Sequence, residues 1–467
     1  MIFLVILTLI VALAFPNIKN SLNPLILIRM TSLVFLFSAF ISFNLYYLNE
    51  INYGIGIYNG LFHVSTINQL FEIFLFIIGS LILFAMYSKN KDFDKVEELG
   101  KNSSSASLSS NTNKNFVDLN YFSEYSLIVL FSTLGSILLL SSYDLISLYL
   151  SIELQSFGVY ILTTIHRNSE KASNAGLKYF LLGGLSSCLI LLGSGLIYSF
   201  TGLTNLESIY SLLSVYDNAT QGASLGIILI ILGLLFKISA APLHNWSPDV
   251  YDSSPTIVTI WLTIMPKISI LIFLLDLITQ LSIGMGLGEI SQINFNYTAY
   301  NEIINIKDSI KILLLLSSAL SLIVGTVVGL AQKRIKRVLA YSTISHIGFI
   351  LLALSINTEQ STEALIFYII QYTISNLAIF LIIIGFGYII KTTALQGSQP
   401  NLSTSEKKAV DSTPSASTKN KVEGGDENIK DIELIYDIKG QFFANPILSL
   451  SLTICLFSMA GQNKSAC

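Results

Sequence analysis

The chain has 467 residues, a formal net charge of −3 and a mean hydropathy of +0.67; 52% of its residues are hydrophobic and 12% are charged. Soluble domains carry about 25% charged residues, so this composition excludes a soluble domain and indicates a polytopic membrane protein. The three cysteines, Cys188, Cys455 and Cys467, form no CxxC pair, which argues against a disulfide scaffold, a zinc site or an iron–sulfur cluster.

Apolar stretches of roughly 18–25 residues, long enough to cross a bilayer, recur along the chain. The first lacks a basic n-region and a cleavage site, so we interpret it as a membrane helix rather than a signal peptide. Because lipid offers the backbone no hydrogen-bond partners, every span is predicted to be helical. About twelve spans are predicted, at 1–16, 24–47, 66–88, 121–141, 144–165, 173–200, 223–243, 256–278, 310–330, 337–356, 362–390 and 443–461.

The basic residues alternate between the loops, which predicts the orientation of the chain. Even-numbered loops hold one basic residue, Lys307, so the odd-numbered loops are expected on the cytoplasm-equivalent side, which is the matrix in a mitochondrion. The amino terminus is then on the opposite side. The odd-numbered loops contain Lys19, Lys89, Lys91, Lys95, Arg167, Lys171, the segment QKRIKR at 332–337, and the lysines from Lys391 to Lys439.

Two polar inserts interrupt the hydrophobic pattern. Residues 89–119, which follow the N-terminal membrane helices in 1–88, and residues 391–440 are rich in Ser, Asn, Lys and Thr. Neither has enough apolar surface to form a core, so both are predicted to be disordered. We interpret them as tolerated insertions rather than binding modules.

Four charged residues lie within predicted spans. They are Glu153, Lys178, Lys237 and Lys267, in consecutive helices. A charge at the bilayer centre costs roughly 2.5–3.5 kcal/mol, and such residues usually face the bundle interior or a water-filled cavity. These four side chains are therefore the candidate functional residues.

Structural explanations for the charges remain open beside a functional one. Lys178 could extend its amine to the interface, and an ion pair of Glu153 could simply fix helix packing. The functional hypothesis is a proton relay, because low dielectric disfavours the charged form of an amine and a nearby carboxylate favours it. On this hypothesis, movement of Glu153 relative to Lys178 would switch the proton affinity of the next lysine.

A helix break is predicted beside Lys237. Pro242 lacks an N–H group and clashes with the preceding turn, so the helix is expected to break between Lys237 and Pro242. Broken helices in transporters expose backbone groups that hold water or ions at mid-membrane depth. His244 could carry protons onward from this break, or it could be an interfacial hydrogen-bonding residue. His346 could extend the relay, or it could contribute only to packing between helices.

Several segments resemble subunit 2 of respiratory complex I, the proton-pumping NADH:ubiquinone oxidoreductase. The resemblance covers roughly residues 120–461, and the chain is similar to the mitochondrially encoded fungal sequences of this family. The segments that carry it are LLFKISAAPLHNWSPDVYDSSPTIVTIWLTIMPKISIL (234–271), SLYLSIELQSFGVYIL, NAGLKYFLLGGLSS and KRIKRVLAYSTISHIGFILLAL.

The resemblance implies an all-α bundle of the antiporter-like type with two inverted five-helix repeats. The first repeat would occupy 120–278 and the second would begin with 310–390. The family's glutamate would be Glu153 and its partner lysine Lys178, while Lys237 and Lys267 would be the broken-helix and central lysines. It also implies a location in the inner mitochondrial membrane.

The resemblance further implies that no cofactor is bound by this chain, since NADH, FMN, iron–sulfur clusters and ubiquinone would act in partner subunits. The expected partners are other complex I subunits, especially antiporter-like neighbours, and membrane lipids, with no nucleic acid. Residues 441–467 resemble an incomplete second broken helix, which predicts that the natural product is longer. Two alternatives remain: a cation/proton antiporter subunit and a redox-silent assembly subunit.

Overall fold

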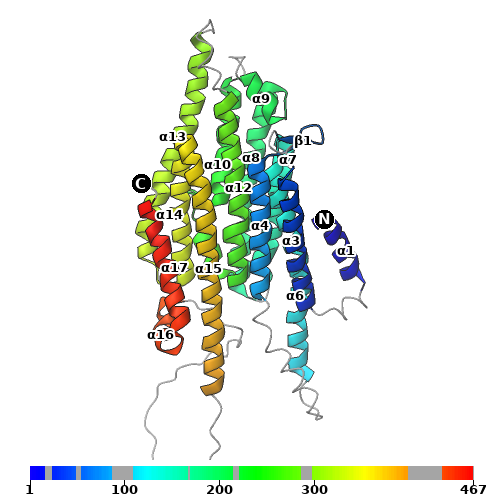
Figure 1. Ribbon diagram of the computed structural model, residues 1–467, viewed down its shortest axis with the longest axis vertical. Helices are drawn as coiled ribbons and strands as arrows, with labels where there is room; N and C mark the ends of the chain where they lie inside the picture. Colours follow the sequence, from blue (N-terminus) through cyan, green and yellow to red (C-terminus); the bar gives the residue numbers. More distant parts are fainter. Residues whose placement is uncertain are drawn as a thin grey trace, which may run out of the picture.

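The computed structural model describes residues 1–15, 24–48, 54–86, 109–166, 169–213, 220–284, 297–397 and 434–465. These residues form a bundle of long helices with roughly parallel axes, together with a small β-hairpin at one end (Figure 1). The helices are α1 (Ile2–Ala14), α3 (Pro24–Tyr46), α4 (Thr66–Met86), α6 (Ser109–Ser141), α7 (Leu145–Thr163), α8 (Glu170–Thr201), α9 (Leu206–Leu213), α10 (Thr220–Ile238), α11 (Trp246–Ser253), α12 (Thr256–Gly284), α13 (Tyr297–Leu330), α14 (Ile335–Ile356), α15 (Glu359–Gly397), η5 (Ile435–Ile438), α16 (Gln441–Ala444) and α17 (Pro446–Ser465).

The predicted spans all lie on helices, but they are not all full membrane spans. Within the described ranges, nine helices are long and apolar enough to cross a membrane. Three shorter apolar helices, Ile2–Ala14, Gly222–Ile238 and Pro446–Met459, occupy the remaining three predicted spans. The second of these is short because α10 ends at the break before Pro242.

Helix α12 lies at the centre of the bundle, against α4, α6, α10 and α15 (Figure 1). Over an 18-residue stretch of this helix, 94% of the residues are buried, in keeping with a sequence that is hydrophobic on nearly all sides. Trp261 is fully buried, and its indole N–H donates a hydrogen bond to Ser132 Oγ of α6 at 3.0 Å. This hydrogen bond helps to fix the rotational orientation of α12 about its axis, and with it the direction of its polar side chains.

Two helix pairs, α6 with α7 and α13 with α14, pack closely through glycines. A Cβ on Gly135 would lie 2.5 Å from the Gln155 backbone nitrogen, and one on Gly325 would lie 2.7 Å from that of Ser345. The two glycines are 190 residues apart, and the helices α7 and α14 begin at Leu145 and Ile335, with the same separation. The two pairs therefore correspond to each other as parts of an internal repeat.

The two repeats are inverted relative to each other. The chain crosses the bundle five times from α6 to α12, counting α10 with α11 as one crossing, so α13 must run opposite to α6. Accordingly, the first turns of α6 and of α13 protrude at opposite ends of the bundle (Figure 1). The predicted all-α, antiporter-like architecture is confirmed, whereas the residue limits assigned to each repeat remain predictions.

The predicted helix break is present between α10 and α11. Ser239 adopts a left-handed conformation with φ of 68°, and Pro242 follows before α11 begins at Trp246. The carbonyl of Phe236 accepts hydrogen bonds from the Ser239 backbone N–H and from the Trp246 indole N–H, both at 3.0 Å. The interruption is therefore a built feature, stabilised by a hydrogen bond across it.

The polar inserts are shorter than predicted. The described structure places residues 109–119 in α6, extends α15 to Gly397 and places 434–440 against the α13–α14 connection. The helical extensions follow from cooperativity, because each residue added to an existing helix gains a hydrogen bond without a new nucleation cost. The remaining parts of the two inserts lie outside the described residues. Of the segment 441–467, the structure describes α16 and α17.

A β-hairpin, β1 (Ile55–Ile57) with β2 (Phe62–Val64), covers the end of the bundle that is poor in basic residues. The carbonyl of Leu61 accepts hydrogen bonds from the Tyr143 backbone N–H and from Ser147 Oγ, both at 3.0 Å. Asn205 Nδ2 donates to the Gly60 carbonyl at 3.1 Å. These contacts attach the hairpin to the turn between α6 and α7 and to the start of α9.

Candidate functional site

A buried acid–amine pair joins α7 to the end of α10. Lys237 Nζ lies 3.8 Å from Glu153 Oε1, and the two side chains are 8% and 16% exposed. The same amine donates a hydrogen bond to Ser156 Oγ at 2.7 Å, one turn from Glu153 on α7. The break after Ile238 leaves Lys237 in the last turn of α10, where the carboxylate can reach it. Both charges of the pair are therefore removed from water and held against each other.

A second buried amine, Lys267 of α12, is lined by hydroxyl and aromatic groups. Its Nζ lies 3.2 Å from Thr343 Oγ1 and 3.4 Å from Ser239 Oγ, and 5.3 Å from the centre of the Tyr251 ring. Lys267 is 2% exposed, and no carboxylate of the described residues pairs with it. The two central lysines thus differ in kind: one is paired with an acid and the other is solvated by neutral groups.

The internal repeat explains this difference. Thr343 follows Glu153 by 190 residues, the same separation that relates Gly325 to Gly135. The second repeat therefore has a threonine hydroxyl where the first has a carboxylate. Each of these two side chains contacts a buried lysine, Glu153 contacting Lys237 and Thr343 contacting Lys267.

Lys178 has a different partner from the one expected. Its amine lies 3.1 Å from Asp249 Oδ2, and its side chain is 56% exposed on the outer face of α8. Its neighbours on that face, Leu177 and Leu181, are exposed as well. The expectation that Glu153 pairs with Lys178 is therefore not met, because α8 turns Lys178 away from the interior and α10 brings Lys237 there instead.

Asp249 belongs to a charged cluster at the basic end of the bundle, which connects α11 to the start of α14. Arg337 donates to Asp249 and to Asp252, in each case at 3.1 Å, and Arg334 also pairs with Asp252. Asp252 is 5% exposed on its side chain. This cluster fixes the lower half of the broken helix of the first repeat to the second repeat.

The two candidate histidines are in different surroundings. His346 of α14 lies one turn from Thr343, and its Nδ1 is 2.7 Å from Tyr368 Oη. His244 lies in the connection after Pro242, and its Nδ1 is buried without a hydrogen-bond partner among the described residues. His346 therefore extends the polar group around Lys267, whereas His244 lies on the other side of the helix break from Lys237.

The hydroxyl groups that complete the site were not predicted from the sequence. Ser156, Ser239 and Thr343 contact the two buried amines, and Tyr368 contacts His346. Serine and threonine are common in membrane helices, so their presence alone carries little information. The separation of 190 residues between Glu153 and Thr343 was the available signal, but it becomes evident only after the two helix pairs are superposed by their glycines.

Comparison with known proteins shows which family has this architecture. The family model described as "NADH:quinone oxidoreductase/Mrp antiporter, TM" matches residues 142–295 and 287–405. The NADH-ubiquinone oxidoreductase chain 2 of Rhizopus oryzae is 45% identical over 462 residues, which cover 98% of this chain and 75% of the relative.

The chain belongs to the NADH:quinone oxidoreductase/Mrp antiporter transmembrane family.

Other members of this family are similar over a smaller part of their length. The NADH-ubiquinone oxidoreductase chain 2 of Marchantia polymorpha is 37% identical over 301 residues, and the match spans 61% of this chain and 57% of that relative. The resemblance inferred from the sequence motifs is therefore confirmed at the level of the family.

Two solved structures contain chains with the same fold as this chain. A chain of respiratory complex I from Thermus thermophilus with bound Aureothin has a TM-score of 0.61 at 21% identity, over 99% of this chain and 78% of that one. A chain of the Mrp complex from Dietzia has a TM-score of 0.58 at 17% identity, over 82% of this chain and 62% of that one. At these identities, the likeness concerns the fold alone.

Proposed function

We propose that this chain is a core membrane-arm subunit of respiratory complex I that translocates protons across the inner mitochondrial membrane. The 45% identity to the Rhizopus oryzae chain over nearly the whole sequence supports this assignment. In the assembled enzyme, electron transfer from NADH to ubiquinone takes place in partner subunits, which hold the FMN and iron–sulfur clusters. The chain itself supplies protonatable groups at membrane depth, next to other antiporter-like subunits and membrane lipids.

The observation that carries the proposal is the contact between Glu153 and Lys237. A carboxylate 3.8 Å from a buried amine stabilises the ammonium form, since low dielectric strengthens the attraction. When partner subunits displace that charge, the ammonium is left uncompensated and its proton is released more readily. Lys267, surrounded by hydroxyl groups, then provides the next acceptor toward the centre of the bundle.

The other residues proposed for the relay lie farther from the Glu153–Lys237 pair. Lys178, Asp249 and the arginines beside them lie at the basic end, where protons would enter from the matrix. His244 lies beyond the break at Pro242, between that end and Lys237. His346 extends the polar group of Lys267 into α14 and α15.

Two other functions make different predictions. An independent cation/proton antiporter would use the same lysines, and the fold likeness to the Mrp complex chain is compatible with it. A redox-silent assembly subunit would need the charged residues only for packing. The long match to an NADH-ubiquinone oxidoreductase chain favours the complex I subunit over both.

Charge-removing substitutions test the function in the assembled complex. Lys237→Met and Glu153→Gln keep side-chain size, so we expect an assembled complex in which proton translocation coupled to NADH oxidation is strongly reduced. Lys311→Met, which removes an exposed lysine from α13, is the matched control and should pump normally. Normal pumping by assembled Lys237→Met would favour the assembly subunit, and sodium-dependent exchange by the isolated chain would favour the antiporter.

A further inference from the structure

A partly buried carboxyl group outside the lysine line lies on the central helix. Asp276 of α12 is nine residues beyond Lys267, about 14 Å along the helix axis, toward the end of the bundle that is poor in basic residues. Its hydrogen-bond partner is Asn68, in the first turn of α4. Asn68 is 5% exposed, and its side-chain oxygen has no hydrogen-bond partner in the described part of the chain.

This carboxyl group has no cationic partner among the described residues. Placing an aspartate in the membrane costs free energy, and one neutral amide offsets only part of that cost. Structural polar contacts between membrane helices are usually made by neutral groups such as Ser, Thr and Asn. An ionisable group in this position is therefore better suited to gaining and losing a proton than to packing.

Other titratable groups lead from Asp276 to the surface. Burial and the negative charges of Glu207 and Asp276 raise the pKa of Tyr143, in the turn between α6 and α7. Burial and the charges of Tyr143 and Asp276 raise the pKa of Tyr210 of α9. Both phenols therefore stay protonated at neutral pH, and both lie near enough to the Asp276 carboxyl group for its charge to act on them.

The path ends beneath the β-hairpin. The ring of His63, on β2, lies 5.0 Å from the ring of Tyr143. Glu207, whose charge acts on both of these groups, is exposed on α9. An imidazole group exchanges protons with water near neutral pH, so this end of the path reaches the aqueous phase.

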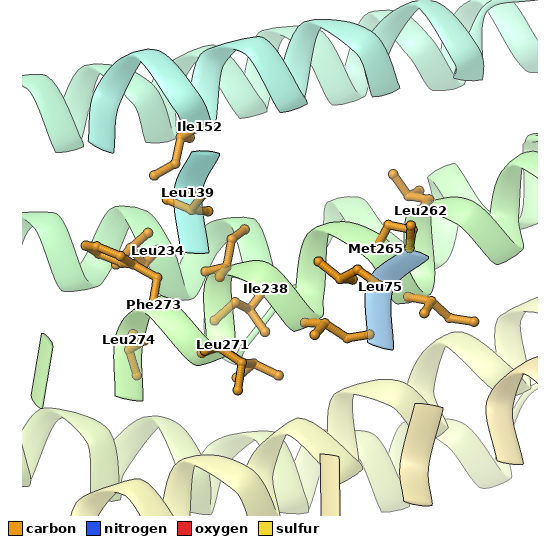
Figure 2. Close-up of a cluster of buried hydrophobic side chains, with 14 of the residues drawn as sticks. Leu75, Leu139, Ile152, Leu234, Ile238, Leu262, Met265, Leu271, Phe273 and Leu274 are labelled. Atoms are coloured by element: carbon orange, nitrogen blue, oxygen red, sulfur yellow. The ribbon is translucent and has the colours of Figure 1, made fainter. Parts of the chain in front are cut away.

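An apolar layer separates Asp276 from Lys267. On α12, the residues between them include Leu271, Phe273 and Leu274, each at most 2% exposed. Figure 2 shows these three side chains in one cluster with Leu234 and Ile238 of α10. Asp276 is thus connected to the surface poor in basic residues and is divided by a dry layer from the central lysine.

We propose that Asp276, held by Asn68, is a proton-release station on the side of the bundle poor in basic residues. The proposal rests on the complex I function proposed above. When water enters the apolar layer, the N–H bond of the Lys267 ammonium breaks as a water molecule takes its proton, and an O–H bond forms on the Asp276 carboxylate as the last water of the chain gives a proton up. That O–H bond breaks when the proton passes by way of Tyr143 and His63 to the aqueous phase, and the carboxylate is restored.

The test uses the whole complex in inside-out membrane vesicles, whose lumen is the side poor in basic residues. Asp276→Asn keeps the hydrogen bond to Asn68 but cannot carry a proton, so NADH-driven lumen acidification should fall at least about tenfold. Asp276→Glu should restore it. Glu72→Gln, one turn from Asn68 on α4, removes another membrane carboxyl and should leave acidification unchanged.

A pH titration separates proton release from packing. Lowering the lumen pH should slow turnover of the unaltered complex, because a protonated station cannot accept a proton, and Asp276→Asn should lose this dependence. Acidification and lumen-pH dependence that are unchanged in Asp276→Asn would overturn the proposal. If pumping is lost in Lys237→Met but kept in Asp276→Asn, only the release station is refuted and the proposed function stands.

Labelling provides a measurement if Asp276→Asn does not assemble. Hydrophobic carbodiimides modify protonated carboxyl groups, so the Asp276 peptide of the unaltered complex should be labelled more as the lumen pH falls. A peptide that is unlabelled at every lumen pH, while the complex remains active, would also overturn the proposal.

Discussion

The difference between the two repeats predicts the effect of Thr343→Glu. Thr343 holds the place in the second repeat that Glu153 holds in the first, and its hydroxyl lies 3.2 Å from Lys267 Nζ. The substitution therefore places a carboxylate beside an amine that has no acidic partner among the described residues. We expect Lys267 to become the partner in a second acid–amine pair and to hold its proton too tightly for transport.

The size of the effect follows from the distance. Opposite charges about 4 Å apart attract by about 4 kcal/mol at an effective dielectric constant of about 20. If half of this attraction must be overcome each time Lys267 releases its proton, that step slows about thirtyfold. Thr343 is fully buried, so the larger side chain also adds roughly 1–3 kcal/mol of packing strain.

The assay compares NADH-driven proton translocation with NADH:quinone electron transfer in membrane vesicles. Thr343→Gln is the matched control, because it introduces the same volume and a polar end without a charge. We expect Thr343→Glu to slow translocation about thirtyfold relative to Thr343→Gln. Equal translocation by the two variants would refute the argument that the charge state of Lys267 depends on its neighbours.

Three further predictions concern packing, the charged cluster and the hairpin. Gly325→Ala should lower thermal stability by about 1–3 kcal/mol, since its Cβ would lie 2.7 Å from the Ser345 backbone nitrogen, whereas Gly184→Ala, with nothing within 4 Å, should be neutral. Asp252→Asn should lower the free energy of unfolding by about 1–3 kcal/mol by removing the negative charge that two arginines share, and an unchanged melting temperature would contradict this. Burial lowers the pKa of His63 despite the opposing charge of Glu207, so the unfolded chain binds the proton more tightly. The hairpin should therefore be fully stable above about pH 6.5 and lose stability below it, seen as faster amide exchange, and His63→Gln should abolish this pH dependence.

The positions of the helices and of the break were predictable from the sequence. Span length and hydropathy are properties of a single segment, so each of the twelve predicted ranges coincides with a helix. The break near Lys237 was predicted from Pro242, because proline lacks the N–H group that an interior helical hydrogen bond needs. Proline alone does not decide a break, since Pro266 lies inside the continuous helix α12. The extent of the polar inserts was overestimated, since composition does not show how far an existing helix continues into polar sequence.

The partners of the charged residues were decided by tertiary structure. Glu153, Lys178 and Lys237 were all recognisable as membrane charges, yet the sequence alone favoured pairing Glu153 with Lys178. The rotation of α8 turns Lys178 outward to Asp249, and the packing of α10 brings Lys237 to Glu153. Such pairings depend on helix rotation and adjacency, which arise from contacts between segments distant in the chain.

Hydropathy and charge along the chain were enough to predict a membrane bundle with protonatable groups at lipid depth, because the free energy of placing each segment in a bilayer depends mainly on that segment. Helix packing places one central lysine against an acid and the other against hydroxyl groups, with an apolar layer between Lys267 and Asp276. The physical reason is that electrostatic interactions depend on distances of a few ångströms between helices, and close packing of glycines and apolar side chains sets those distances.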